Sequence, residues 1–242
     1  MPIRFWFTLA LLLSAVPGFG ADLPSGEYVN NADQSATLDI TRTAAGKTHF
    51  EMVVVGFNTN ICSMSGSIAG LLGLPMEGSN GPADQSCKLH FTRAGQGLSI
   101  DYEGDGCMAY CGLGVSLPTD WAAVPEACYH APYQATRQAF LKAYKAGHYA
   151  EAKALLAPLL HTCQPTLDTL DADALANDLA ITLHHLGDDA GCRAMLQPMA
   201  KDAARTEAAV ASDYPSARWD AYRPILHNAR TNLGLCESGG VK

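Results

Sequence analysis

The chain lacks the short motifs that mark the common enzyme classes. It contains no HExxH, GxSxG, P-loop or GxGxxG sequence, so nothing predicts zinc-peptidase, serine-hydrolase or nucleotide chemistry. Cysteine pairs with metal-ligand spacing are scarce as well, because only Cys107 and Cys111 lie close together and no second pair matches them. We therefore expect no enzyme activity, no catalytic residue, no cofactor and no bound metal.

Long apolar runs are equally scarce. One is present at residues 5–16, directly after Arg4 and before Pro17. It is shorter than the about 20 residues that span a bilayer. Small residues before Ala21 predict a cleavage site, so residues 1–20 are expected to form a signal peptide. No cysteine stands at the cut. We expect a soluble protein of a bacterial periplasm, with no membrane insertion after cleavage.

Basic residues are few in the first half of the chain. Residues 21–123 carry eleven acids and four bases, a net charge of −7, whereas residues 124–242 carry thirteen acids and eleven bases, a net charge of −2. An acidic surface disfavours nucleic acid and anionic lipid as partners and favours a basic protein. Solubility alone also explains an acidic surface, so the charge does not by itself name a function.

The composition changes near residue 122. Gly, Thr and Val are frequent before this point, and Ala and Leu are frequent after it. The length after cleavage is sufficient for two small domains. We predict an α+β protein with a disulfide-bonded antiparallel β domain at residues 21–123, an all-α domain at residues 124–242, and a junction around Pro125.

Alternating apolar and polar residues predict the strands of the first domain. The alternation occurs at residues 37–41, 50–54, 88–93 and 98–103, with turn sequences inside each successive pair. Two hairpins with flanking strands predict a small barrel or a sandwich.

All eight cysteines follow the predicted cut, four of them before residue 125 and four after it. An even number in an exported chain predicts disulfides. If Arg93 pairs with Leu98, Cys87 falls opposite residue 104 and close to Cys107. This register favours Cys87–Cys107 and leaves Cys62–Cys111, although four cysteines allow three connectivities.

An acidic segment follows the last predicted strand. Asp101, Glu103 and Asp105 imitate the start of a calcium-binding loop, with Gly106 at position six. Position twelve should be Glu, but it is Gly112. Residues i and i+2 share a face, so a glycosidase carboxylate pair is a further alternative, although no sugar-binding cleft is indicated. We favour a strand with an acidic outer face that runs into a turn.

The second domain contains an internal repeat. Residues 147–158 align without a gap with residues 187–198, at an offset of forty. The initial Gly is identical in both copies and predicts the end of one helix and the turn into the next. Two helical hairpins follow from this pattern. Pro158 and Pro198 are expected to kink or end their helices, because proline removes a backbone donor.

Hairpin turns also predict the remaining disulfides. A turn at Gly147 brings residue 128 near residue 163, and a later turn at residues 213–215 brings residue 192 near residue 236. We therefore expect Cys128–Cys163 and Cys192–Cys236. His184 and His185 are adjacent, so they point about 100° apart on a helix. They are expected to lie at the surface or at an edge and not to form a metal pair.

The sequence Gly147-x-Tyr149-x-x-Ala152 resembles the tetratricopeptide repeat, and the resemblance spans residues 130–200. The second copy departs from the pattern, with Asp189 and Cys192 in place of Tyr and Ala, and the family's usual period is shorter. The resemblance implies a scaffold for protein interactions. Since two copies are too few for a long groove, a purely structural role is an equal alternative.

The first domain carries four short motifs. These are Gly26-Glu-Tyr28, Cys62 with Ser65-Gly66, Cys87-Lys-Leu, and Cys107-x-x-Tyr110-Cys111-Gly112. In them the domain resembles the small exported β domains of bacterial lysozyme inhibitors and related toxin-neutralising proteins. Such inhibitors present a Ser-Gly loop to the enzyme cleft, which implies a loop at residues 63–70 here, without the basic and aromatic residues usual in that family. The partner-binding residues that we expect are Ser63, Ser65, Ser67, Asp101, Glu103 and Asp105.

These observations predict a periplasmic inhibitor or immunity protein. Its partner would be a basic exported protein, either a lysozyme-like cell-wall hydrolase or a delivered toxic effector. Opposite charge would speed association, and a disulfide-bonded loop would lower the ordering cost of binding. The alternative is a periplasmic scaffold or assembly protein that binds its partner through the helical repeat.

Overall fold

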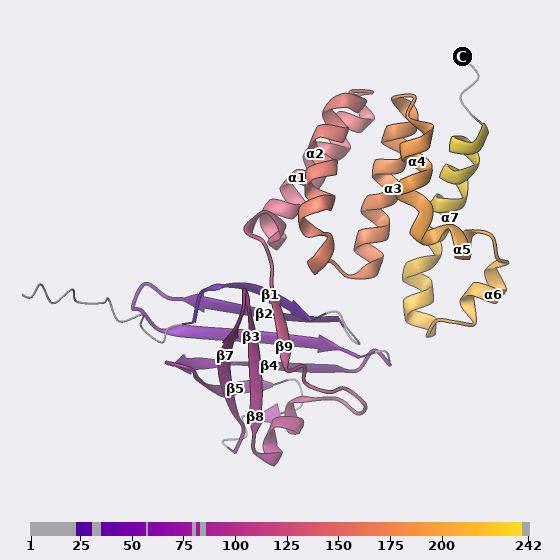
Figure 1. Cartoon of the computed structure of the whole chain (residues 1–242). Helices are drawn as coiled ribbons and strands as arrows, with labels where there is room; N and C mark the ends of the chain where they lie inside the picture. The colour runs from indigo at the N-terminus through magenta and orange to yellow at the C-terminus, as the bar shows by residue number, and fades with distance from the viewer. Residues whose placement is uncertain (1–22, 31–34, 57, 79–80, 83–85, 239–242) are drawn as a thin grey trace, which may run out of the picture.

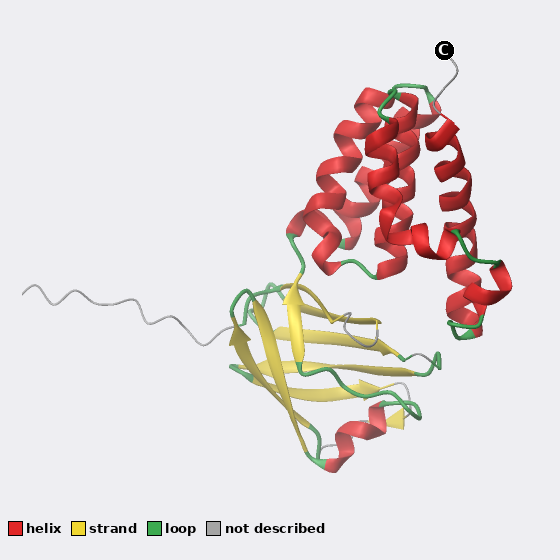
Figure 2. Ribbon diagram, turned by 45° about the vertical axis from the view of Figure 1, so that its right-hand side comes forward, coloured by secondary structure: helices red, strands yellow, loops and turns green. Residues whose placement is uncertain are grey.

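The computed structural model describes residues 23–30, 35–56, 58–78, 81–82 and 86–238. The predicted signal peptide and its cleavage site lie outside these described residues. All described strands precede residue 124, and all described α-helices follow residue 129. The protein is therefore α+β, with a β part followed along the chain by a helical part (Figures 1 and 2).

The β part is a closed antiparallel barrel of eight strands. The barrel order is β4-β3-β2-β1-β9-β8-β7-β5, and pairing between β4 and β5 closes the ring, while the short β6 pairs only with β5. Closure decides between the barrel and the sandwich that the sequence left open. The strands are β1 Gly26–Asn30, β2 Ser35–Arg42, β3 Thr48–Val55, β4 Ile61–Ala69, β5 Leu72–Gly78, β6 Gly81–Pro82, β7 Lys88–Ala94, β8 Gly97–Glu103 and β9 Asp120–Ala123.

The barrel interior is filled by every second residue of the strands, as the alternation predicted. Leu38 and Ile40 of β2 and Phe50 of β3 are almost fully buried, and the Phe50 ring meets the Phe91 ring edge to face. This period of two sends the intervening residues to the outer surface. The outer faces of β1 to β4 therefore consist of the polar members of the pattern, together with several valines.

One expectation is wrong. Residues 63–70 do not form a loop: residues 63–69 belong to β4, which pairs with β3 on one side and with β5 on the other. The inward positions of β4 include Cys62, Gly66 and Ile68, and glycine and cysteine weaken the apolar signal of a strand. The resemblance to lysozyme inhibitors implied a loop here, whereas the alternation of buried and outward positions is that of a strand.

The structure forms the four disulfides at the expected pairs. In the barrel, the register of β7 and β8 places Arg93 opposite Leu98. This register brings Cys87, just before β7, close to Cys107, just after β8. Four disulfides indicate an oxidising environment. The pairs are Cys62–Cys111, Cys87–Cys107, Cys128–Cys163 and Cys192–Cys236.

The helical part contains seven described α-helices. Helices α1 and α2 pack side by side, as do α3 and α4, and α7 packs against both α3 and α4 (Figure 1). No described helix is both long enough and apolar enough to cross a bilayer. The α-helices are α1 His130–Lys145, α2 Tyr149–Cys163, α3 Thr169–His185, α4 Asp189–Leu196, α5 Ala200–Ala203, α6 Glu207–Ala211 and α7 Ser216–Ser238, and the 3₁₀ turns are η1 Asp105–Tyr110, η2 Glu126–Cys128, η3 Gln164–Thr166 and η4 Gln197–Met199.

The internal repeat reappears as two matching turns. Gly147 and Gly187 have φ angles of 77° and 79°, a left-handed conformation that glycine adopts without strain. The next residue donates its backbone N–H across the turn in both copies, from His148 to the Ala143 carbonyl at 3.0 Å and from Asp188 to the Leu183 carbonyl at 2.9 Å. Helices α2 and α4 begin one residue later. The forty-residue offset is thus a structural repeat of the helical hairpin.

The two repeat prolines behave differently. Helix α4 ends at Leu196, before Pro198, as expected, whereas α2 continues through Pro158 to Cys163. A proline in a helix leaves the carbonyl four residues earlier without its donor. That residue, Ala154, is exposed, so solvent can satisfy its carbonyl. Ala194, the equivalent residue before Pro198, is exposed as well, so exposure does not account for the difference between the two helices.

The barrel and the helices meet through β1. The Glu27 carbonyl accepts a backbone hydrogen bond from Val124 at 2.9 Å. The Glu27 carboxylate accepts the backbone N–H of His130, the first residue of α1, with both oxygens at 3.2 Å. A carboxylate at this position satisfies an N–H that the helix leaves unpaired. Glu27 thus caps α1 from the barrel.

Candidate partner-binding face

Three acids on the outer face of the barrel lie side by side on neighbouring strands. Glu27 on β1 is directly opposite Asp39 on β2, and Asp39 is directly opposite Glu51 on β3. The register continues to Ser65 on β4 and to residue 77 on β5. We call Glu27, Asp39 and Glu51 the acidic row.

The acidic row is electrostatically unfavourable in the free protein, because like charges directly opposite on adjacent strands repel. Burial raises the pKa of Asp39, and the neighbouring Glu51 raises it further. Burial also raises the pKa of Glu27, although the hydrogen bond from His130 acts in the other direction. Within the described part of the chain, neither the Asp39 carboxylate nor the Glu51 carboxylate has a hydrogen bond or an ion pair. No such contact among these residues therefore relieves the repulsion.

A shallow pocket of about 540 Å³ covers the row. Its lining includes the three acids of the row, together with the polar residues Ser25, Thr41, Arg42 and Tyr129. A hollow of this kind suits a basic side chain of another molecule. The lining residues are Ser25, Gly26, Glu27, Asp39, Ile40, Thr41, Arg42, Glu51 and Tyr129.

The three predicted serines lie on this same outer face. Ser63, Ser65 and Ser67 alternate with buried residues along β4 and are half-buried. Ser65 lies directly opposite Glu51 on β3. The serines thus extend the acidic row as a flat polar surface and do not protrude as a loop tip.

The three predicted acids lie elsewhere. Asp101 and Glu103 are exposed on β8, and Asp105 starts η1. Glu103 accepts a hydrogen bond from Lys88 Nζ at 2.8 Å and lies 2.7 Å from His90 Nε2, and these contacts lower its pKa. Strands β5 and β7 separate β8 from β4 in the barrel order. The structure therefore does not join the predicted serines and the predicted acids into one site.

The segment that imitates a calcium loop is a strand that runs into a 3₁₀ turn. Residues 101–103 belong to β8, and η1 begins at Asp105. Among the residues that the structure describes, no three His, Cys, Asp or Glu side chains are placed to hold a metal ion. The segment is therefore a strand that runs into a turn, with exposed acids on its outer face, as predicted.

The sequence contained a signal for the acidic row. Glu27, Asp39 and Glu51 are spaced twelve residues apart, and Asp39 and Glu51 occupy polar positions of alternating strands. A hairpin register centred on the turn at residues 43–47 places Asp39 opposite Glu51. Residues 26–28 stand out in the sequence only as a short motif, with no predicted partner strand. Glu27 therefore cannot be placed beside Asp39 and Glu51 from the sequence.

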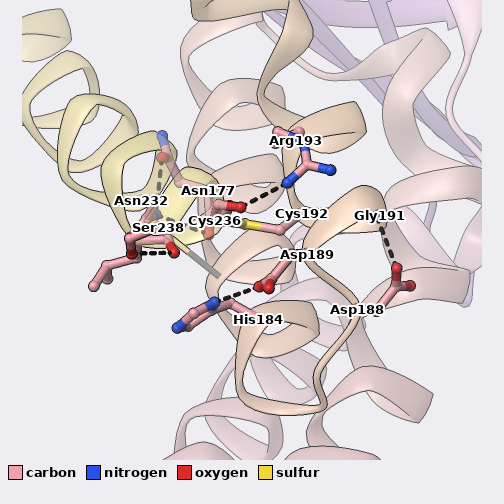
Figure 3. The surroundings of a disulfide bond; sticks show 11 residues. Asn177, His184, Asp188, Asp189, Gly191, Cys192, Arg193, Asn232, Cys236 and Ser238 are labelled. Carbon is pink, nitrogen blue, oxygen red and sulfur yellow. Dashed lines mark hydrogen bonds and ion pairs between the residues drawn. A yellow bond between two sulfur atoms is a disulfide. The ribbon is translucent and has the colours of Figure 1, made fainter. Parts of the chain in front are cut away.

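The helical hairpins carry an equivalent pair of side chains across each turn. In the first hairpin the rings of Tyr144 and Tyr149 pack with centroids 5.4 Å apart. Forty residues later, His184 Nδ1 lies 2.6 Å from an Asp189 carboxylate oxygen (Figure 3). The same two positions therefore hold the turn by aromatic packing in one copy and by a polar contact in the other. His185 joins the copies, because its ring stacks on Tyr149 at 4.2 Å.

A disulfide occupies the other position at which the second copy departs. Ala152 is fully buried on α2, and its equivalent Cys192 is fully buried on α4. Cys192 is bonded to Cys236 on α7, and Arg193 donates to the Cys236 carbonyl at 2.6 Å (Figure 3). The small buried alanine of the first copy thus corresponds to a cysteine in the second copy, and this cysteine links α4 covalently to α7.

Comparison of the chain with protein-family models, with curated proteins and with solved structures finds no match.

Proposed function

We propose that the chain is an exported inhibitor or immunity protein of the periplasm, which binds a basic partner protein through the outer face of β1 to β4. The partner class is a lysozyme-like cell-wall hydrolase or a delivered toxic effector. The observation that carries the proposal is the acidic row, in which three carboxylates lie in register under a pocket and two of them have no partner among the described residues.

The row has the energetics of a binding site rather than of a stabilising feature. In the free protein the opposed carboxylates repel, and burial keeps the pKa of Asp39 raised. A basic partner would replace this repulsion with attraction, so part of the favourable free energy appears only on binding. Electrostatic complementarity of this kind mainly raises the association rate and excludes acidic competitors.

The barrel scaffold supports the same reading. A closed barrel with two disulfides presents its outer face with little conformational freedom, which lowers the ordering cost of association. The serines of β4 add hydroxyl groups that can donate to or accept from a partner backbone.

The proposal is tested by the digestion of peptidoglycan by a basic lysozyme, with clearing of a cell-wall suspension as the readout. The unaltered chain is expected to slow clearing, and the double variant Asp39→Asn/Glu51→Gln is expected to inhibit about ten-fold less well. The variant Glu207→Gln/Asp220→Asn removes the same two charges from exposed helical positions and should inhibit like the unaltered chain. Inhibition by the unaltered chain should also weaken as salt rises.

Co-expression in the periplasm with the exported product of the neighbouring gene covers the effector alternative. Protection of the host that depends on Asp39 and Glu51 would support an immunity role. If the chain neither inhibits the lysozyme nor protects the host, the proposal is wrong.

A second candidate is a tetratricopeptide-like scaffold, which the matched turns at Gly147 and Gly187 favour. The buried Ala152 is consistent with it, because a small residue lets the two helices of a hairpin pack closely. In that case charge reversal of exposed Lys142 and Lys145 on α1 should abolish partner binding. The Asp39→Asn/Glu51→Gln variant should then bind normally.

A further inference from the structure

The loop predicted at residues 63–70 is a strand, but the barrel presents a different rigid projection. The turn at residues 112–114 follows η1, and Leu113 at its tip is 89% exposed. Moving a leucine side chain out of water lowers the free energy. Exposure of Leu113 is therefore unfavourable unless another molecule covers the side chain. A disulfide and several hydrogen bonds hold the turn in this position.

The backbone just before the tip of the turn is fixed to the barrel. Gly112 donates its N–H to the Ile61 carbonyl at 2.8 Å. The preceding residue, Cys111, is bonded to Cys62 of β4, with Cα atoms 3.9 Å apart. A disulfide and a backbone hydrogen bond therefore connect the turn to the start of β4.

Two asparagines hold the tip itself. The side-chain amides of Asn58 and Asn60 both donate to the Leu113 carbonyl, each at 2.7 Å. The residue between them, Thr59, has a φ angle of 65°, which a β-branched residue seldom adopts. Strained residues of this kind are found where a functional geometry requires them. The amides on either side of Thr59 both reach one carbonyl and so hold the backbone of the turn at Leu113.

The flanking glycines are required by the same geometry. Gly114 has a φ angle of 76°, and a Cβ on Gly112 would lie 2.9 Å from the Cβ of Asn60. Side chains on either side of Leu113 would therefore shift the tip. In the Gly112-Leu113-Gly114 sequence, Leu113 is therefore the only residue with a side chain.

The chemistry around the tip indicates what it contacts. Val55 and Ile61 lie directly opposite each other on β3 and β4 and are 39% and 42% exposed. Residues 48–87 and 94–129, which include β3, β4, β8, β9 and the Leu113 turn, contain no lysine and no arginine. Along β3 the outward positions lead from Val55 through Val53 to Glu51 of the acidic row. An apolar projection thus adjoins a surface without these cations.

We propose that Leu113 is the anchor of the interface, and that it inserts into an apolar recess bordered by basic side chains on the partner protein. This inference rests on the proposed function and names the part of the chain that enters the hydrolase cleft or effector surface. The anchor supplies burial at the centre of the contact, and the acidic row supplies charge complementarity beside it. Its rigid turn lowers the ordering cost of binding.

The first test measures binding of the full chain to a basic lysozyme by biolayer interferometry. Leu113→Ser should weaken the affinity by about 10- to 100-fold, as expected for loss of one buried leucine side chain. Its melting temperature should not change, because Leu113 contacts solvent. Leu186→Ser removes a partly exposed leucine from the helical part and should bind like the unaltered chain. Asn58→Ala/Asn60→Ala, which frees the tip but keeps Leu113, should weaken binding by a smaller factor.

The second test separates this inference from the proposed function. A photo-crosslinking amino acid is placed at position 113 or, as a control, at position 186, in the intact exporting host. A crosslink from position 113 alone to a basic protein that is not a cell-wall hydrolase or toxin supports the anchor and contradicts the proposed function.

Three outcomes overturn the anchor. The first is unchanged lysozyme binding by Leu113→Ser while Asp39→Asn/Glu51→Gln loses binding, which leaves the proposed function standing. The second is a crosslink from position 113 only to a second copy of this chain. The third is no crosslink from position 113 in a host that the chain protects.

Discussion

Particular acids of the helical part differ in their surroundings from two acids of the barrel face. In the helices, Asp178 meets Arg137 at 2.6 Å, and Arg205 lies between Asp202 and Asp213. In the barrel, Asp39 and Glu51 oppose each other and have no such partner among the described residues. The helical pairs are thus closed within the fold, whereas the two opposed carboxylates of the barrel face are not matched by a base among the described residues.

Two glycines, one in each part, differ in how tightly their surroundings are packed. A Cβ on Gly66 in β4 would lie 2.2 Å from the Leu74 carbonyl oxygen, whereas nothing lies within 4 Å of a Cβ on Gly187. Gly66→Ala should therefore destabilise by about 4 kcal/mol or more, because neither strand can move apart in a closed barrel. Urea unfolding measures the change. Gly187→Ala is the control and should cost about 1 kcal/mol, from its positive φ alone; equal losses would contradict the distinction.

The disulfide on α4 sharpens the comparison between the two hairpins. Cys192→Ala/Cys236→Ala restores the alanine that the first hairpin has at the equivalent position, but releases α7. We expect a loss of about 3 kcal/mol in the free energy of unfolding, since the bond closes a long loop. Hydrogen exchange should accelerate in α7 and stay unchanged in the barrel. Unchanged exchange in α7 would show that packing alone holds the helix.

A half-buried acid in the helices provides a counterpart to the acidic row. Burial raises the pKa of Asp173 to about 6, with Asp168 and Asp202 adding to the rise. A raised carboxyl pKa in the folded state destabilises the protein above that pKa, and the penalty disappears as the pH falls toward the unfolded value. Asp173→Asn should therefore stabilise by about 1 kcal/mol at pH 7.5, allowing for solvent screening of this half-buried group, and by little at pH 4.

Urea unfolding of Asp173→Asn at the two pH values decides this point. Equal stabilisation at pH 7.5 and pH 4 would exclude the charge as the cause. Partner binding should not change in this variant, because Asp173 lies on α3 and away from the barrel face.

The smallest expected effect concerns the row itself. Asp39→Asn should stabilise the free protein by about 0.5 kcal/mol at neutral pH, because it removes repulsion between directly opposed carboxylates. Since the pKa of Asp39 is raised in the folded state, the gain should shrink as the pH falls through that pKa. Thermal unfolding measures stability, and the lysozyme assay measures function. A variant that is more stable and also inhibits less well would identify the row as a binding feature; a less stable variant would contradict it.

Local patterns predicted much of the fold. Alternation located β2, β3, β7 and β8, and the register of Arg93 with Leu98 led to the pairing of Cys87. The matched glycines at positions 147 and 187 located the turns of both helical hairpins. These features depend on neighbours within a few residues, where sequence patterns are informative.

Features that depend on distant contacts were harder to predict. The hairpin of β4 and β5 was missed because its inward positions include Gly66 and Gly73, which carry no apolar signal. Closure of the barrel needs β1 to pair with β9 across more than ninety residues, and no local pattern encodes that contact. The same limit applies to the site, since the acidic row and the Leu113 turn each combine residues from separate segments.

The order of the disulfides along the chain has a consequence for biogenesis. In the helical part each cysteine is bonded to the next one in sequence, 128 to 163 and 192 to 236, whereas in the barrel the 87–107 bond is nested inside the 62–111 bond. A chain oxidised in the order in which it emerges from a translocation channel would form the helical bonds correctly at the first attempt. It would first join Cys62 to Cys87, and thiol exchange would have to correct that error. Maturation of the barrel should therefore require a disulfide isomerase, whereas the helices need only an oxidant.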